Sequence, residues 1–233
     1  MKKKRILGII PARGGSKGIP GKNLRKISGK PLIQYTIEAS QGSKLLSDFI
    51  ISTDSEEIAN FSRSIGGKVP FIRPSNLSTD KALSLPVILH ALKFMERSIE
   101  NKYDIVVMLQ CTTPLRNSDD IDNALSILLG GQADSVISVT EVGANHPLRM
   151  KRIVDGRLIN YIEQGVEDMR PRQDLPPAYI RNGGIYAANR EVFVDDNSFS
   201  GDDCYAYYMP PERSVNVDTL ADFILVKEYI SHS

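Results

Sequence analysis

Residues 9–23 read Ile-Ile-Pro-Ala-Arg-Gly-Gly-Ser-Lys-Gly-Ile-Pro-Gly-Lys-Asn. This stretch carries four glycines and three cationic side chains, Arg13, Lys17 and Lys22, directly after an apolar run. Glycine lets backbone N–H groups approach an anion closely, and the cationic side chains supply compensating charge. The stretch therefore predicts a loop that binds a polyphosphate, most simply a nucleoside triphosphate.

Two common phosphate-binding motifs do not fit this loop. A P-loop aligned on Gly21-Lys22 would place Ser16 at its first glycine and Asn23 at its magnesium-binding hydroxyl. The dinucleotide fingerprint Gly-x-Gly-x-x-Gly has no register here, and the first helical pattern begins only near Pro31. The plainer alternative is a surface loop, but the strand pattern before it favours phosphate binding.

The composition agrees with a soluble enzyme of one large domain. The chain has 233 residues, of which 41% are hydrophobic and 24% charged. A net charge of +1 argues against nucleic acid as a partner. The apolar run 6–10 is too short for an export signal, and no run approaches the ~20 residues that cross a bilayer, so we expect no membrane partner. The two distant cysteines, Cys111 and Cys204, indicate a cytoplasmic location.

Strand and helix patterns alternate along most of the chain, which is typical of a parallel sheet covered by helices on both faces. We expect an α/β fold with a three-layer, mostly parallel, Rossmann-like sheet. Ser118 is expected to cap its helix. The predicted strands are 5–11, 48–53, 68–71, 104–109, 135–140 and 179–188, and the predicted helices are 31–41, 55–65, 85–99, 118–129 and 218–230.

The pattern changes from about His146 onward. Residues 150–162 place Asp155-Gly156 between two alternating arms, which indicates a hairpin with a type I′ turn. A proline-rich, extended stretch follows it. We therefore predict one domain, 1–233, from which residues 146–178 leave the sheet as an excursion.

Polar segments follow several predicted strands. Ligands of open α/β sheets bind beyond the carboxyl ends of the strands, so these segments are candidate site elements. An amide at a strand exit, as at Gln110, can hold sugar hydroxyls; its plainer alternative is a satisfied loop amide. Arg73 and Ser84 have the alternatives of a surface arginine and a helix cap. The segments are 13–23, 53–54, 73–84 and 110–116.

Motifs from these segments and from the rest of the chain occur in a defined order: Pro11-Ala-Arg-Gly-Gly-Ser-Lys-Gly-Ile-Pro-Gly-Lys-Asn23, Ser52-Thr-Asp54, Arg73-Pro74 with Ser78-Thr-Asp80, Leu109-Gln-Cys-Thr-Thr-Pro-Leu-Arg116, Pro171-Arg-Gln173, Asn182-Gly-Gly-Ile-Tyr186 and Val217-Asp-Thr219. Together they resemble the CMP-sialic acid synthetases (N-acylneuraminate cytidylyltransferases) and their bacterial relatives acting on legionaminic, pseudaminic and similar nine-carbon acids. The resemblance covers essentially the whole chain, and the first motif is the most specific.

The resemblance implies a nucleotidyltransferase that moves CMP from CTP to the anomeric hydroxyl of a nine-carbon 2-keto-3-deoxy sugar acid and releases pyrophosphate. It also implies Mg²⁺ as cofactor and a homodimer whose excursion reaches the partner's site. By position, the triphosphate would be held by Arg13, Ser16, Lys17 and Lys22, and the cytidine by Asn23, Arg73, Ala82 and Ser84. Gln110 would contact the sugar, and Arg149 and Arg172 its carboxylate, Arg149 in the other subunit.

The displacement of pyrophosphate requires cationic residues of the kind that the resemblance implies. Displacement of pyrophosphate depends on positioning and on neutralising charge, which the loop cations and magnesium would supply. None of His90, His146 and His232 lies in a pattern suited to a catalytic dyad, so we expect metal-assisted catalysis without a covalent enzyme intermediate. We expect the catalytic residues to be Arg13, Lys22 and Asp218.

The predicted metal ligands depart from the family pattern. Many relatives carry Asp-x-Asp-Thr where this chain reads Asn216-Val-Asp-Thr219. An amide contributes a neutral oxygen, so Asn216 is the weaker ligand for a hard cation and Asp218 the principal one. Capping of the last helix is an alternative role for Asp218.

Three functions stay open at this point. The first is the nine-carbon acid cytidylyltransferase. The second is a neighbouring nucleotidyltransferase, for example one acting on the eight-carbon 3-deoxy-manno-octulosonate. The third is a non-catalytic nucleotide-binding regulatory domain. The sequence does not reveal which acid is used, because pocket shape decides that discrimination.

Overall fold

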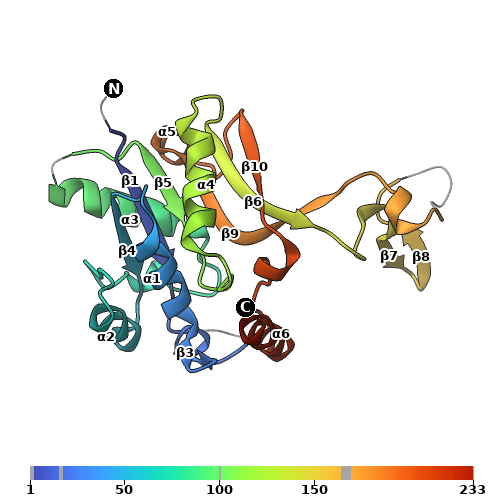
Figure 1. The fold of residues 1–233 in the computed structure, drawn as a ribbon, viewed down its shortest axis with the longest axis horizontal. Coiled ribbons are helices and arrows are strands. Elements are labelled where there is room, and N and C mark those ends of the chain that lie inside the picture. Colours follow the sequence, from blue (N-terminus) through green and yellow to red (C-terminus); the bar gives the residue numbers. More distant parts are fainter. Residues whose placement is uncertain (1–2, 16–17, 100, 164–168, 233) are drawn as a thin grey trace.

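A six-stranded sheet forms the centre of the computed structural model, which describes residues 3–15, 18–99, 101–163 and 169–232 (Figure 1). Its strand order is β10-β6-β9-β5-β1-β4. Strand β9 is antiparallel to both of its neighbours, and the other five run in one direction. The predicted mostly parallel sheet is therefore confirmed. The strands are β1 (Ile6–Pro11), β4 (Asp48–Ser52), β5 (Ile105–Met108), β6 (Ser135–Glu141), β9 (Tyr179–Asn189) and β10 (Cys204–Tyr208).

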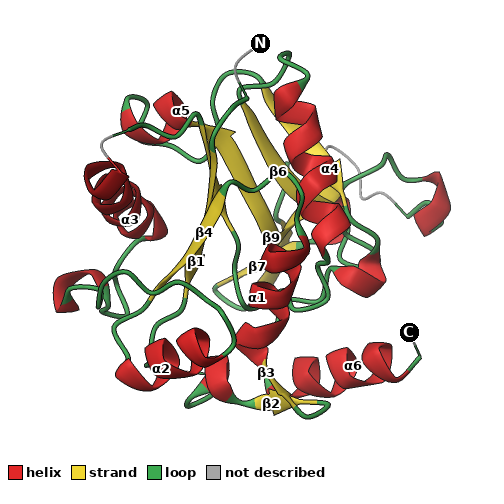
Figure 2. Cartoon of the chain, turned by 60° about the vertical axis from the view of Figure 1, so that its left-hand side comes forward, coloured by secondary structure: helices red, strands yellow, loops and turns green. Residues whose placement is uncertain are grey.

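Helices cover both faces of this sheet, as the apolar character of β1 on both sides requires (Figure 2). Ile6 and Ile10 point to one face and Leu7 and Ile9 to the other, because successive side chains of a strand alternate. The first face packs against α1 (Leu32–Gly42), α2 (Glu56–Ser64) and α4 (Ser118–Leu129), and the second against α3 (Ser84–Ile99) and α5 (Arg190–Val194).

A third apolar cluster lies beside the sheet and holds the last helix, α6 (Leu220–Ser231). Val217, Phe223 and Val226 pack there against Ile19 and Ile27. This contact brings the segment before α6 next to the loop that follows β1. Further short elements of the chain are β2 (Lys26–Ile27), β3 (Lys30–Pro31) and the 3₁₀ turns η1 (Lys22–Leu24), η2 (Ser75–Leu77) and η5 (Pro211–Arg213).

Residues 146–178 are called the arm from here on, and their described parts, 146–163 and 169–178, extend away from the sheet (Figure 1). The arm carries the hairpin of β7 (Lys151–Val154) and β8 (Arg157–Asn160) between the turns η3 (Pro147–Arg149) and η4 (Arg172–Asp174). Asp155 and Gly156 have φ values of 50° and 76°, and these two positive values are those of the predicted type I′ turn.

The predicted strand 68–71 is wrong. Its backbone runs beside β4, where the Ile51 N–H donates to the Lys68 carbonyl at 2.8 Å, and one isolated bridge joins Thr53 to Ile72. Pro70 lies in the middle of this stretch and has no N–H to donate, so a regular ladder cannot continue through it.

The structure corrects the expected cap of α4 and excludes the alternative role of Asp218 as a cap. Helix α4 is capped by Asn117 rather than Ser118: the Asn117 side chain accepts from the Asp120 N–H at 2.9 Å, and Asp120 accepts from the Asn117 N–H at 3.0 Å. In the same way Thr219, paired with Asp222, caps α6, so Asp218 is not the cap. These reciprocal bonds satisfy two otherwise unpaired donors at each helix start.

We predict that Asn117→Ala lowers the free energy of unfolding by about 1 kcal/mol, because it removes the cap of α4. Urea unfolding followed by circular dichroism measures this. Ser118→Ala is the matched control and should change stability by much less. Equal losses in the two variants would contradict the assignment of the cap to Asn117.

Candidate functional site

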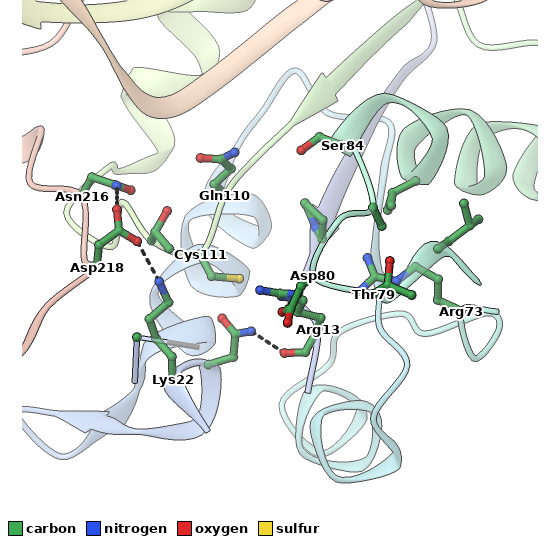
Figure 3. A pocket seen from close by; sticks show the side chains of 17 residues that line it. Arg13, Lys22, Arg73, Thr79, Asp80, Ser84, Gln110, Cys111, Asn216 and Asp218 are labelled. Carbon is green, nitrogen blue, oxygen red and sulfur yellow. Dashed lines mark hydrogen bonds and ion pairs between the residues drawn. The ribbon is translucent and has the colours of Figure 1, made fainter. Parts of the chain in front are cut away.

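A pocket of about 600 Å³ opens at the carboxyl edge of the sheet (Figure 3). Segments that follow β1 and β5, the connection that leads into α3, and the segment before α6 meet there. Among the predicted site residues, those lining it are Arg13, Lys22, Asn23, Arg73, Ala82, Ser84, Gln110, Asn216 and Asp218. The other lining residues are Pro11, Gly18, Leu77, Thr79, Asp80, Val87, Cys111 and Thr112.

The first predicted triphosphate contact, Arg13, is paired with a carboxylate. Its Nη1 donates to Asp80 Oδ1 at 2.6 Å, and both side chains remain partly exposed to the pocket. The buried Asn23 side chain donates to the Arg13 carbonyl at 2.9 Å and so fixes the backbone at this point. Asn23 thus holds the loop from behind while Arg13 faces the cavity.

A second cation–carboxylate pair lies on the opposite side of the pocket (Figure 3). Lys22 Nζ donates to Asp218 Oδ1 at 3.0 Å and to the Val217 carbonyl at 2.8 Å. The other oxygen of Asp218 accepts from the Asn216 amide. Burial alone would raise the pKa of neighbouring Asp222, but hydrogen bonds from the Asp218 and Thr219 N–H groups lower it below its ordinary value.

Arg73 is a buried wall residue rather than a surface arginine. Only 5% of it is exposed, and its Nε donates to Ser78 Oγ at 3.1 Å. Burial lowers the pKa of Arg73, while Asp54, 3.6 Å from its Nη2, acts in the opposite direction. Asp54 also accepts from the Gly14 N–H at 2.9 Å, so one carboxylate joins the loops that follow β1 and β4.

Ala82 and Ser84 line the same wall at the entrance to α3. Ser84 is the first residue of that helix, so its side chain stands at a helix N-terminus, where the backbone favours negative charge and hydrogen-bond acceptors. The small side chain of Ala82 leaves the adjoining space open. These positions suit a polar group such as a nucleobase or a ribose.

Gln110 and Cys111 follow β5 and form the far wall. Burial raises the pKa of the Cys111 thiol to about 12, so it is protonated at neutral pH and is not an activated nucleophile. Of these two side chains, the Gln110 amide is therefore the one that can bind a polar group of a ligand.

Among the predicted site residues that the structure describes, Arg149 and Arg172 do not line this pocket. Ser16 and Lys17 lie outside the residues that the structure describes. Arg149 and Arg172 lie on the arm: Arg149 Nη2 donates to the Arg170 carbonyl at 2.8 Å, and Arg172 borders a separate pocket of about 210 Å³ at the base of the arm. Within one chain, the two predicted carboxylate contacts are therefore not brought to the Gln110 wall.

Asp80 is the charged residue among the lining residues that the sequence reasoning did not assign to the site. Its motif, Ser78-Thr-Asp80, is visible in the sequence, but the distance to Arg13 along the chain is 67 residues. Only the fold places the two side chains together. Among the described residues, no group of three or more His, Cys, Asp or Glu side chains could hold a metal ion. Nor does any helix in the described ranges have the length and apolar character needed to cross a membrane.

The fold and the pocket define an α/β protein with a polar pocket, lined by paired cationic and carboxylate side chains, at the carboxyl edge of its sheet. Residues 7–192 match the cytidylyltransferase family, and the chain belongs to that family of nucleotidyltransferases. The N-acylneuraminate cytidylyltransferase of Streptococcus agalactiae serotype V is 39% identical over 221 residues, which are 94% of this chain. The chain spans only about half of that relative, 51% of its length.

Another relative is matched over nearly its full length. The CMP-N,N'-diacetyllegionaminic acid synthase of Legionella pneumophila is 31% identical over 226 residues, which cover 96% of this chain and 95% of the relative. Among solved structures, CMP:2-keto-3-deoxy-manno-octonic acid synthetase complexed with CTP superimposes with a TM-score of 0.71. The sequence identity there is 18%, over 98% of this chain and 99% of the other, so that likeness concerns the fold alone.

Proposed function

We propose that the protein transfers CMP from CTP to the anomeric hydroxyl of a nine-carbon 2-keto-3-deoxy sugar acid and releases pyrophosphate. The observation that carries the proposal is the meeting of Arg13, Lys22, Arg73, Gln110 and Asp218 around one pocket in a chain of this family. The relatives named for N-acylneuraminate and for legionaminic acid favour a nine-carbon acceptor.

The two cation–carboxylate pairs supply the charge that this reaction needs. A triphosphate bound in the pocket would replace Asp80 as the partner of Arg13 and Asp218 as the partner of Lys22, because the triphosphate carries more negative charge than a single carboxylate. Ser16 and Lys17 belong to the same proposed contact. Arg13 and Lys22 would then neutralise the pyrophosphate as it separates, and such electrostatic stabilisation is usually the largest catalytic contribution.

The cytidine part would lie against Asn23, Arg73, Ala82 and Ser84. Their arrangement supports this because a buried guanidinium, a small side chain and a helix start lie along one wall. In-line displacement needs the acceptor hydroxyl and the departing pyrophosphate on opposite sides of the α-phosphorus. The acceptor would therefore approach from the Gln110 side, while Arg13 and Lys22 hold the pyrophosphate.

Asp218 and Asn216 fit a divalent cation that is shared with the nucleotide, and we propose Mg²⁺. Mg²⁺ usually takes one or two carboxylates and completes its shell with phosphate oxygens and waters. The Asp218 side chain is 63% exposed to the pocket, whereas the Asn216 amide must turn to present its oxygen. When bound, the ion would stabilise the charge on the leaving pyrophosphate.

The arm supports a homodimer within the proposal. Across its hairpin, Ile153 pairs with Leu158, and these side chains are 77% and 69% exposed. Exposed apolar side chains of this kind usually mark an interaction surface. A second copy of the chain would cover them and bring Arg149 and Arg172 to the partner's acceptor side. We also propose that residues 1–233 form one domain. The protein would act in the cytoplasm, where CTP is made.

The proposed function predicts pyrophosphate release only when CTP, Mg²⁺ and a nine-carbon acid are all present. A colorimetric pyrophosphate assay with sialic, legionaminic, pseudaminic and eight-carbon acids tests this. If only the eight-carbon acid gave turnover, the protein would be the 3-deoxy-manno-octulosonate type of nucleotidyltransferase. CTP binding without turnover of any acid would favour a regulatory domain. Lys22→Ala should weaken CTP binding, whereas exposed Lys26→Ala is the matched control.

Asp218→Ala should reduce magnesium-dependent turnover by at least about 100-fold. The fold should stay intact, because Thr219 and Asp222 cap α6 without Asp218. Thermal unfolding and turnover as a function of Mg²⁺ concentration measure the two effects. Asn216→Asp restores a second carboxylate and should lower the Mg²⁺ concentration for half-maximal rate. Full activity of Asp218→Ala would show that the metal assignment is wrong.

Mixed dimers test whether the arm serves the partner's site. Lys22→Ala and Arg172→Ala should each be nearly inactive, because one damages the pocket and the other the arm. After dissociation and random reassociation in equal amounts, about a quarter of wild-type activity should return, since each mixed dimer regains one intact site. Adding Ile153→Asp to both chains should prevent recovery. If the mixture of Lys22→Ala and Arg172→Ala chains, without Ile153→Asp, stays inactive, the arm does not act on the partner's site.

A further inference from the structure

Arg116 is a buried arginine behind the Gln110 wall of the pocket. It is 1% exposed, and its Nη1 donates to two backbone carbonyls, that of Gln110 at 3.1 Å and that of Gly184 at 2.9 Å. Its Nε and Nη2 are buried and have no hydrogen-bond partner among the described residues. A buried cation with unpaired donors costs free energy, so its value for stability is small. Its main structural effect is to hold the Gln110 and Gly184 carbonyls together.

The two carbonyls, of Gln110 and Gly184, lie where β-sheet hydrogen bonds no longer join the β5 segment to β9. The antiparallel pairing of β5 with β9 ends at Met108 and Tyr186, so Gln110 lies beyond the last paired residue. Beyond that point, the Arg116 guanidinium links the two segments by hydrogen bonds to the Gln110 and Gly184 carbonyls. Thr113 adds a second link, since its hydroxyl donates to the Asn182 carbonyl at 3.0 Å.

The Gln110 side chain lies directly over Gly183. A Cβ at Gly183 would be 2.8 Å from Gln110 Oε1 and 3.5 Å from Asn216 Oδ1. Gly183 also has a φ of 78°, which favours glycine. The position of the Gln110 amide therefore depends on the distance between the loop after β5 and Gly183-Gly184 of β9. Arg116 holds these two segments together through its hydrogen bonds to the Gln110 and Gly184 carbonyls.

We propose that Arg116 is a positioning residue for the acceptor: by binding the carbonyls of Gln110 and Gly184, it fixes the Gln110 amide over Gly183, at the wall that receives the sugar acid. This inference rests on the proposed function of the pocket. Arg116 does not line the pocket, so it acts through Gln110 and leaves the nucleotide contacts Arg13 and Lys22 unchanged.

Arg116→Lys tests the proposal, because it keeps the charge and loses the fork that binds two carbonyls at once. The KM for the acid should rise about tenfold, while the Kd for CTP changes less than twofold. In a Gln110→Ala background the same substitution should add no further effect, as a double-mutant cycle requires for residues that act as one unit. Arg190→Lys is the control: this arginine binds Glu96 at 2.7 and 3.0 Å away from the pocket, and its replacement should lower Tm without a selective rise in KM for the acid.

A folded Arg116→Lys enzyme with wild-type KM for the acid would overturn the proposal, as would effects that add to those of Gln110→Ala. If Arg116→Lys does not fold, Gly183→Ala displaces the same amide from the pocket side and should raise the KM for the acid with CTP binding retained; an unchanged KM overturns the proposal. If the wild-type protein turns over no acid, the proposed function fails instead. A crystal structure of Arg116→Lys then decides positioning alone: a displaced Gln110 amide supports it, and an unmoved one refutes it.

Discussion

The parallel pairing of β1 with both β4 and β5 is the constraint on which the site depends. Parallel strands end at the same edge of a sheet, so the loops after these strands must meet there. Asp54 strengthens the meeting by accepting from the Gly14 N–H and facing Arg73. Because β1 is buried on both faces, this geometry is held by the centre of the protein rather than by the loops themselves.

Charge in the pocket is balanced before any ligand enters. Arg13 has Asp80 and Lys22 has Asp218 as partners, on opposite sides of the cavity. In the proposed reaction a triphosphate replaces both carboxylates, and one of them becomes available for the metal. The same two carboxylates would therefore neutralise Arg13 and Lys22, and one of them would bind the metal when the nucleotide is bound. Asn216, which binds Asp218 here, would take part in that exchange.

Most long elements could be predicted from the sequence, because apolar periodicity directly reflects burial. The prediction failed where local chemistry decides. Pro70 interrupts an otherwise strand-like stretch, and Asn117 outcompetes Ser118 as a cap. Strand β10 was not predicted because it is an edge strand with mostly exposed side chains, so its sequence carries no alternation between a buried and an exposed face. Helix α5 has only five residues, too few for a periodic signal.

The sequence by itself determined the α/β class, the loop after β1 and most of the residues around the pocket, because motif content and strand order place polar segments at one edge. Only the tertiary structure decided which side chains pair, since Arg13 and Asp80, or Lys22 and Asp218, are brought together by contacts distant in sequence. It also decided that Arg149 and Arg172, which the sequence already assigns to the excursion, do not line the pocket of their own chain. Finally, it placed Arg116 behind that wall, because burial and backbone carbonyls as partners leave no mark in a motif.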